Sequence, residues 1–347
     1  MDKREQAEEE LRNRRYIGID GGGTKTACII GDGTGRILAI CYGESSSIKS
    51  RPWDEVKRVL KELIEQAMEL SRSPMDQLAG VFLGLAGADR PEERKRLYAF
   101  MRELLPEHAT ITVHNDAITA LAAGTWGEGG IVLISGTGSI AYGYLPESDT
   151  YVRVGGWGYL LGDEGSGYDI GRQALVAVMK EHDGRGVKTR LTEQLLAYWS
   201  LSDPNQIISY VYSQANPRTV IADAAKWTLM TAEQGDEVAE KIVQKAAAEL
   251  AELIITAKRR LAELRPDADV SRLPVVLSGG LFANEGFVRR LSAHEAVAAS
   301  GLSLRRLGIP PAAGCYILAL KQAGIQITDN IKQHIADWEA GGEATVG

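Results

Sequence analysis

Two glycine-rich turns, one in each half of the chain, have the residue types that hold phosphate groups. The first is GIDGGGTKT, residues 18–26, and the second is LISGTGSIAYG, residues 133–143. In both, an apolar run leads into the turn and another leaves it, which predicts a strand, a tight turn and a second strand. Glycines have no Cβ, so backbone N–H groups can approach a bound anion closely. We predict that the two hairpins hold the phosphates of one nucleotide from opposite sides.

The spacing excludes two common phosphate-binding motifs. A P-loop places G-x-x-x-x-G-K-[ST] between a strand and a helix. Here Lys25 follows residues 21–24, and the next residues, TACIIGD, read as a strand. A dinucleotide-binding G-x-G-x-x-G also opens a helix. A single glycine-rich corner is usually only a hairpin turn, so the prediction depends on the second copy and on the acidic segments.

Two aspartates end predicted strands where a carboxylate could act on a phosphate group. Asp20 precedes the first turn and could hold Mg²⁺ directly or through water, or it could start the turn by bonding its own backbone. Asp116 follows the strand TITVHN and precedes a helix. It is therefore either a helix N-cap or a general base that accepts the proton of an attacking hydroxyl.

Two further segments have the composition of binding loops. GGWGYLLGDEGSGYDIG, residues 155–171, combines many glycines with acidic residues around Trp157. Its Asp163 and Glu164 could bond sugar hydroxyls beside an apolar wall, although Asp163 could instead cap the helix predicted from near Ser166. In SGGLFANEGF, residues 278–287, a double glycine follows a strand and would allow an adenosine to approach closely.

The elements that must position these residues alternate between strands and helices in both halves of the chain. The order of three strands and then alternating helices and strands starts at about residue 16 and again at about 130. This pattern predicts an α/β fold with a mostly parallel sheet in each of two duplicated lobes. Strands are expected near 16–45, 79–87, 110–116, 130–156 and 274–280, and helices near 53–71, 91–105, 118–124, 166–181, 236–264 and after Pro311.

Composition excludes several other classes of protein. The formal net charge of −7 argues against nonspecific nucleic-acid binding. No apolar run reaches 18 residues, and the charged N-terminus has no apolar core of a signal peptide, so we expect neither a membrane span nor a secreted protein. The three cysteines are scattered without a C-x-x-C motif, which argues against disulfide, zinc and iron–sulfur frameworks. A cytoplasmic location fits these features.

Together these segments resemble the sugar kinase/heat-shock-70/actin superfamily, whose motifs match in order and spacing across about residues 16–322. The matching segments are 18–26, HNDAITALAAG at 114–124, 132–143, 278–287 and the helix near 312–322. Within it, the chain looks closest to N-acetylglucosamine kinases and BadF/BadG-type ATPases, through the first hairpin, GLAGADRPEE, the NDA of 115–117, LISGTGS and the 155–171 loop. The resemblance implies two ribonuclease H-like, actin-like ATPase lobes with an interlobe cleft. We place the lobes at residues 1–117 and 118–324, with the tail of about 325–347 packing back on the first lobe or fraying.

The resemblance implies ATP-dependent phosphorylation of the 6-hydroxyl of an amino sugar, first of all N-acetylglucosamine, with Mg²⁺. Asp116 would be the catalytic base and Asp20 the metal ligand. The motifs and the resemblance together assign ATP binding to Gly22, Gly23, Thr24, Lys25, Gly136, Thr137, Gly138, Gly279, Gly280 and Asn284. They assign sugar binding to Ser47, Asp116, Ser139, Gly156, Trp157, Gly158 and Asp163. The family often forms dimers, so the expected partners are ATP, a sugar and a second copy of the chain.

Some alternatives stay open. N-acetylglucosamine kinases are expected to carry an Asn after the third strand, where this chain has ESSSIKS, residues 44–50, with Ser47 nearest. Glucosamine and N-acetylmuramic acid are therefore alternative substrates, and an ATPase activator or regulator without a sugar substrate is the alternative of another class. The related zinc-dependent repressors carry a Cys-rich motif that is absent. The dehydratase-activating ATPases carry cluster-binding cysteines that Cys28, Cys41 and Cys315 do not match.

Overall fold

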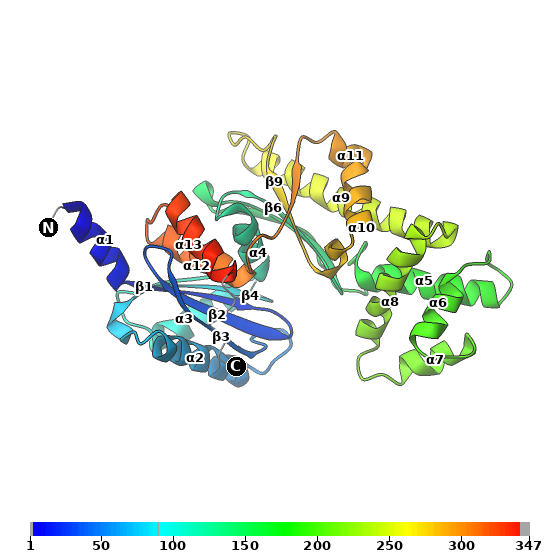
Figure 1. Ribbon diagram of the computed structural model, residues 1–347, viewed down its shortest axis with the longest axis horizontal. Helices are drawn as coiled ribbons and strands as arrows, with labels where there is room; N and C mark the ends of the chain where they lie inside the picture. Colours follow the sequence, from blue (N-terminus) through cyan, green and yellow to red (C-terminus); the bar gives the residue numbers. More distant parts are fainter. Residues whose placement is uncertain (1–2, 89, 341–347) are drawn as a thin grey trace. The chain divides into compact units, whose positions relative to one another are not determined.

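The computed structural model describes residues 3–88 and 90–340 and divides the chain into two compact units. Unit 1 comprises Met1–Gly129 and Leu307–Gly347, and unit 2 comprises Gly130–Arg306. Each unit contains a five-stranded sheet with helices packed against it (Figure 1). The α/β class predicted from the sequence is thereby confirmed. Among the described residues, no helix is both long and apolar enough to cross a bilayer.

The sheet of unit 1 brings its functional candidates to one edge. Its strand order is β3-β2-β1-β4-β5. Strand β2 is antiparallel to both β1 and β3, and β4 and β5 run parallel to β1. The register pairs Asp20 with Gly84, and Gly84 with His114, on three adjacent strands. Ligands of open α/β sheets bind at this carboxyl edge. The strands are β1 (Arg15–Gly21), β2 (Lys25–Asp32), β3 (Ile37–Glu44), β4 (Leu78–Leu85) and β5 (Thr110–His114).

Helices cover both faces of this sheet because strand side chains alternate between the faces. Ile17 and Ile19 belong to the core that α2 and α3 complete on one face, while Gly18 between them faces the backbone of α12. The helix α2 forms as expected, with an apolar stripe at helical spacing buried against β2 and β3. The helices of unit 1 are α1 (Lys3–Asn13), α2 (Trp53–Leu70), the short η1 (Met75–Gln77), α3 (Pro91–Leu104), α4 (Asp116–Thr125), α12 (Pro311–Gln322) and α13 (Asp329–Ala340).

The boundary between the units differs from the one placed at residues 117/118. Helix α4 packs against α12 and β4, so the first unit extends to Gly129 and the chain re-enters it at Leu307. The physical reason is that the second face of the first sheet needs a cover, which α4 and α12 provide from opposite ends of the sequence. Residues 307–324 therefore belong to unit 1, rather than to a lobe of residues 118–324. The described part of the tail forms α13, whose His334 Nδ1 lies 2.8 Å from the Thr34 carbonyl oxygen.

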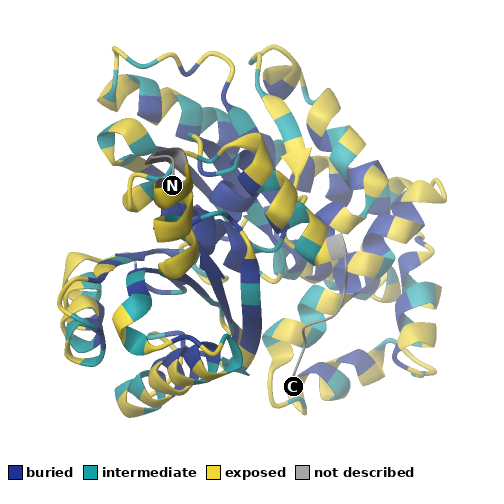
Figure 2. Ribbon diagram, turned by 60° about the vertical axis from the view of Figure 1, so that its left-hand side comes forward, coloured by how far each residue is buried: buried dark blue, intermediate teal, exposed yellow. Residues whose placement is uncertain are grey.

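Unit 2 repeats the strand pattern of unit 1, with three antiparallel strands followed by two parallel ones. Its sheet order is β10-β9-β6-β7-β8, and buried residues concentrate on the strands and on the inner sides of the helices (Figure 2). The strands are β6 (Gly130–Ser135), β7 (Ser139–Leu145), β8 (Thr150–Gly155), β9 (Pro274–Ser278) and β10 (Ser303–Arg306). The helices are η2 (Pro146–Ser148), α5 (Gly167–His182), α6 (Leu191–Tyr198), α7 (Asn205–Tyr212), α8 (Pro217–Glu233), α9 (Glu237–Leu264), η3 (Gly280–Ala283), α10 (Glu285–Ala293) and α11 (Glu295–Ala298).

We expect Gly314→Ala to destabilise the protein, because α12 packs closely against the backbone of α4 at this glycine. A Cβ at Gly314 would lie 2.1 Å from the carbonyl oxygen of Thr119, and both helix backbones would have to separate. Overpacking of this kind costs about 1–3 kcal/mol, which outweighs the gain of about 1 kcal/mol from better helix propensity. Urea unfolding should show the loss. Gly308→Ala is the matched control, because no atom lies within 4 Å of the added Cβ there. Equal stability of the two variants would contradict the expectation.

Candidate active site

The first glycine-rich turn joins β1 to β2 as predicted and leaves part of its backbone open. The amide of Gly22 donates to the Lys25 carbonyl oxygen at 3.0 Å, which closes the turn. A Cβ at Gly23 would meet no atom within 4 Å, and Thr24 and Lys25 are exposed. No contact within the fold therefore requires Gly23, and the open backbone suits an approaching anion.

The serines after β3 support this turn. Ser45 Oγ donates to the Gly22 carbonyl oxygen at 2.9 Å, and Ser46 Oγ lies 2.9 Å from Thr26 Oγ1. Ser47, the predicted sugar contact, is buried, and its amide donates to Ser45 Oγ at 3.2 Å. These contacts link the segment at residues 44–50 to the phosphate turn.

Asp20 and Asp116 lie close together at the carboxyl edge of the unit 1 sheet, connected through Thr119. The Thr119 Oγ1 lies 2.9 Å from Asp20 Oδ1 and 2.7 Å from the backbone oxygen of Asp116. Burial raises the pKa of Asp20 to about 7; the hydrogen bond from Thr119 opposes this shift, and the nearby Asp116 carboxylate adds to it. When Asp20 is protonated, its carboxyl group can donate to Thr119 Oγ1 while Thr119 donates to the backbone oxygen of Asp116. Both contacts are then hydrogen bonds.

Asp116 is the first residue of α4 and is not its N-cap. Asn115 occupies the cap position, where its side-chain oxygen accepts from the Ala117 amide at 2.9 Å. The capping alternative for Asp116 is therefore excluded. The half-buried Asp116 instead places a carboxylate at the N-terminus of a helix, a few residues beyond the end of β5.

We expect Asp20→Asn to stabilise the ligand-free protein increasingly as the pH rises from about 4 to about 7. In the folded protein the pKa of Asp20 is about 7 instead of 3.8, so the folded state keeps a proton that the unfolded state has released. The wild type therefore loses stability with rising pH over this window, whereas Asn does not ionise. Urea unfolding of both proteins at pH 5, 6, 7 and 8, without Mg²⁺, measures the difference. A difference independent of pH would refute the raised pKa.

The second glycine-rich turn, between β6 and β7, is held by the loop at residues 155–171. The Gly136 amide donates to the Gly138 carbonyl oxygen at 2.9 Å, and the Gly167 amide at the start of α5 donates to the Gly136 carbonyl oxygen at 2.7 Å. Ser139, the predicted sugar contact, donates from Oγ to the Glu164 carbonyl oxygen at 2.7 Å. The second phosphate turn and the predicted sugar loop thus form one hydrogen-bonded assembly in unit 2.

Asp163 is a buried residue of that loop and does not cap α5. Ser166 caps the helix instead, with its Oγ accepting from the Asp169 amide at 3.2 Å. The Asp163 carboxylate pairs with Arg218 of α8 at 3.1 Å and accepts from the Gly158 amide at 3.3 Å. Burial raises the pKa of Asp163 above its usual value, and the Arg218 guanidinium opposes that shift.

The outer part of the same loop exposes apolar side chains. Trp157 is 66% exposed and has the Arg153 guanidinium 4.9 Å from its ring centre, and Leu160 and Leu161 are more exposed still. Gly156 and Gly158 allow this course because both have positive φ angles, +69° and +88°. An exposed aromatic ring and a buried carboxylate in one loop suit a sugar ring, which presents an apolar face and polar edges.

The predicted adenosine segment follows β9, and its two glycines differ in their structural role. Gly279 has a φ of +106°, and a Cβ there would lie 2.3 Å from the carbonyl oxygen of Ser135, so the local backbone itself requires glycine. Gly280 has open space around it. Asn284 caps α10 by accepting from the Phe287 amide at 2.7 Å, which leaves its NH₂ group for a ligand.

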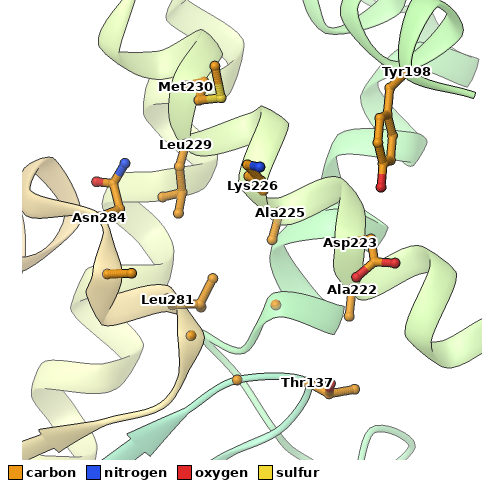
Figure 3. A pocket seen from close by; sticks show the side chains of 14 residues that line it. Thr137, Tyr198, Ala222, Asp223, Ala225, Lys226, Leu229, Met230, Leu281 and Asn284 are labelled. Carbon is orange, nitrogen blue, oxygen red and sulfur yellow. The ribbon is translucent and has the colours of Figure 1, made fainter. Parts of the chain in front are cut away.

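A cavity of about 590 Å³ in unit 2 brings the second phosphate turn and the adenosine segment together. Figure 3 shows Asn284 at the left and Thr137 at the bottom, with the labelled side chains of α8, from Ala222 to Met230, along the right and upper side. The lining residues are Gly136, Thr137, Gly167, Tyr198, Ala222, Asp223, Ala225, Lys226, Leu229, Met230, Gly280, Leu281, Ala283 and Asn284. The cavity is large enough for a small-molecule ligand such as a nucleoside.

Sequence reasoning missed the contribution of α8, which supplies six of these lining residues, Ala222, Asp223, Ala225, Lys226, Leu229 and Met230. The available signal was the Asn216–Pro217 pair, which marks a helix start. Nothing in the helical pattern indicates which face would line a ligand cavity, because that depends on packing against α5 and α9.

Comparison with known proteins identifies the family of the chain. Residues 17–301 match the model of the BadF/BadG/BcrA/BcrD ATPase family. An N-acetylmuramic acid/N-acetylglucosamine kinase of Clostridium acetobutylicum is 39% identical over 67% of this chain and 76% of its own. An N-acetyl-D-glucosamine kinase of Dictyostelium discoideum is 34% identical over 80% and 88%. A crystal structure of a candidate N-acetylglucosamine kinase from Chromobacterium violaceum, 26% identical, superposes with a TM-score of 0.63, covering 88% of this chain and 99% of its own.

The family match covers most of the chain and includes both glycine-rich turns, Asp116, the 155–171 loop and the adenosine segment. The structural match confirms the predicted actin-like architecture of two α/β units. We conclude that this chain belongs to the BadF/BadG/BcrA/BcrD ATPase family and uses ATP.

Proposed function

We propose that this protein is a kinase that transfers the γ-phosphoryl group of ATP to the 6-hydroxyl of an amino sugar, first of all N-acetylglucosamine. The observation that carries the proposal is the proximity of the Asp20 and Asp116 carboxylates near the first glycine-rich turn, with Asn115 rather than Asp116 as the N-cap of α4. The substrates named for the relatives, N-acetylglucosamine and N-acetylmuramic acid, support the amino-sugar class.

The catalytic residue of the proposed reaction is Asp116. It accepts the proton of the sugar 6-hydroxyl while that oxygen attacks the γ-phosphorus and the bond to the ADP oxygen breaks. Backbone amides of residues 23 and 24 and of residues 137 and 138 stabilise the negative charge on the phosphoryl oxygens, and preorganised donors of this kind contribute much of such catalysis. The exposed Lys25 in the first turn adds a positive charge.

The residues also fit the Mg²⁺ that accompanies ATP. Among the described residues, no three His, Cys, Asp or Glu side chains gather into a metal site. Mg²⁺ is commonly held by only one or two carboxylates together with substrate phosphates, and Asp20, with Asp116 close by, supplies that number. When bound, Mg²⁺ would neutralise charge on the phosphates, and Asp20 would hold it in its ionised form.

The proposed sugar contacts are Asp163, Trp157 and the backbone around Gly156 and Gly158 in unit 2, together with Ser47. Because Ser47 stands where relatives are expected to carry Asn, glucosamine and N-acetylmuramic acid remain alternative substrates. A homodimer and a cytoplasmic location remain predictions from the sequence.

The test is ADP release from Mg·ATP with N-acetylglucosamine, glucosamine, N-acetylmuramic acid, N-acetylmannosamine or glucose. We expect N-acetylglucosamine to give the highest kcat/KM and a 6-phosphate product. Equal rates on N-acetylmuramic acid would mean that the site has room for a substituent at the sugar 3-position. ADP release that no sugar increases would reject the kinase and favour an ATPase activator.

A further inference from the structure

Arg218, in the first turn of α8, lies against both the predicted sugar loop and the second phosphate turn. Its Nη2 atom is 3.1 Å from Asp163 Oδ2. A Cβ built on Gly138 would lie 2.7 Å from the same Asp163 oxygen and 3.0 Å from the same Arg218 nitrogen. The ion pair therefore packs directly on the predicted phosphate turn, and a side chain at position 138 would displace it.

The backbone of Asp163 is strained, and the hydrogen-bonding capacity of Arg218 is not fully used among the described residues. Asp163 has a φ of +63°, in the left-handed region that a non-glycine residue seldom adopts. Its side chain is only 5% exposed, whereas that of Arg218 is 37% exposed. The Nε of Arg218 is buried without a hydrogen-bond partner among the described residues. Local strain and an unsatisfied buried donor cost free energy, and they cluster at functional sites.

The two partners belong to segments with different predicted ligands. Asp163 lies in the loop of Trp157, where we place the sugar. Arg218 lies one turn before Ala222 and Asp223, which line the cavity where we place the nucleotide (Figure 3). Tyr159 of the same loop has its ring centre 5.1 Å from the Arg218 guanidinium and so adds a second contact between the loop and α8.

We propose that the Asp163–Arg218 ion pair couples the sugar and nucleotide sites, with Arg218 as a positioning residue. The inference rests on the proposed kinase function. A sugar hydroxyl that bonds to Asp163 changes how the carboxylate holds Arg218. Because both groups pack on Gly138, that change reaches the turn that binds the phosphates. Coupling of this kind is reciprocal, so the nucleotide must alter sugar affinity by the same factor.

Calorimetric titration of Mg·ADP with and without saturating N-acetylglucosamine tests the proposal. In the wild type we expect the sugar to tighten ADP binding by about 5–10-fold, at the lower end of typical coupling. In Arg218→Gln we expect a ratio near 1, with each ligand still binding alone. Arg218→Lys keeps the charge and should retain part of the coupling. Arg265→Gln is the matched control, because it removes the 2.6 Å Arg265–Asp267 pair of the same unit outside the cavity and the loop.

Two outcomes would overturn the coupling: a wild-type ratio of 1, or an unchanged ratio in Arg218→Gln. Thermal melting checks that each variant is folded, and Arg218→Met, which keeps the length of the side chain without its charge, replaces Arg218→Gln if that variant does not fold. If the wild type phosphorylates the sugar while the ratio is unchanged in the variants, only the coupling fails. If the wild type neither binds nor phosphorylates any sugar of the panel, the proposed function fails, and the coupling with it.

Discussion

Asp116→Asn is expected to lower the turnover of the amino-sugar kinase reaction by about 10²–10⁴-fold, the usual scale for loss of a general base. Asn has nearly the shape of Asp but cannot take the proton of the 6-hydroxyl. The fold should tolerate the change, because Asn115 rather than Asp116 caps α4. The affinity for Mg·ADP should stay within a few-fold of the wild type, since the backbone turns and the unit 2 cavity are unchanged.

The measurement is steady-state kcat with saturating ATP and sugar, together with Mg·ADP affinity by calorimetry. Glu92→Gln is a suitable control, because it changes an exposed carboxylate in the first turn of α3, also in unit 1. Turnover near the wild-type value in Asp116→Asn would remove Asp116 from the mechanism. Equal losses of turnover and of ADP affinity would indicate a role in nucleotide binding instead.

Gly280→Val should lower ADP affinity by about 100-fold or more, equivalent to about 2.7 kcal/mol. A Cβ at position 280 would meet no atom of the described residues within 4 Å, so valine should fit the fold and project into the cavity of unit 2. The methyl groups would then occupy space that we assign to adenosine. Val is a better test than a longer side chain, because its branched Cβ limits the rotamers that could turn away.

Calorimetric titration of Mg·ADP measures the loss, and Gly308→Val provides the control, since Gly308 also has open space but does not line the cavity. Unchanged ADP affinity in a folded Gly280→Val protein would move the adenosine away from this cavity. Loss of affinity in both variants would show that a general effect of valine, rather than occupied space, is responsible.

Local pattern was sufficient to predict the elements and the motifs. Runs of apolar residues bounded by glycines predict strands and hairpins, so the turns at residues 21–25 and 136–138 follow from the amino-acid pattern alone. The same holds for the amphipathic helices α2 and α9, whose buried residues follow helical spacing. The order of these motifs also indicated the family, because motif order is a property of the sequence alone.

The sequence pattern did not decide which of two nearby residues caps a helix. Asn115 and Asp116 can each cap a helix, and so can Asp163 and Ser166. The structure selects Asn115 and Ser166, so neither Asp116 nor Asp163 is the N-cap of its helix. A shift of the helix start by one residue changes the free energy little locally, so packing of the whole helix decides it.

What the sequence by itself determined, then, is the α/β order, the two glycine-rich turns, the acidic residues next to them and the family. Only the tertiary structure showed that α4 and α12 complete the first unit, that α8 lines the cavity of unit 2, and that Arg218 pairs with Asp163 across 55 positions of the chain. The physical reason is the distance along the sequence over which the deciding interactions act. Turns and amphipathic periods depend on residues a few positions apart, whereas a helix finds its neighbours, and an arginine its carboxylate, only when the whole core packs.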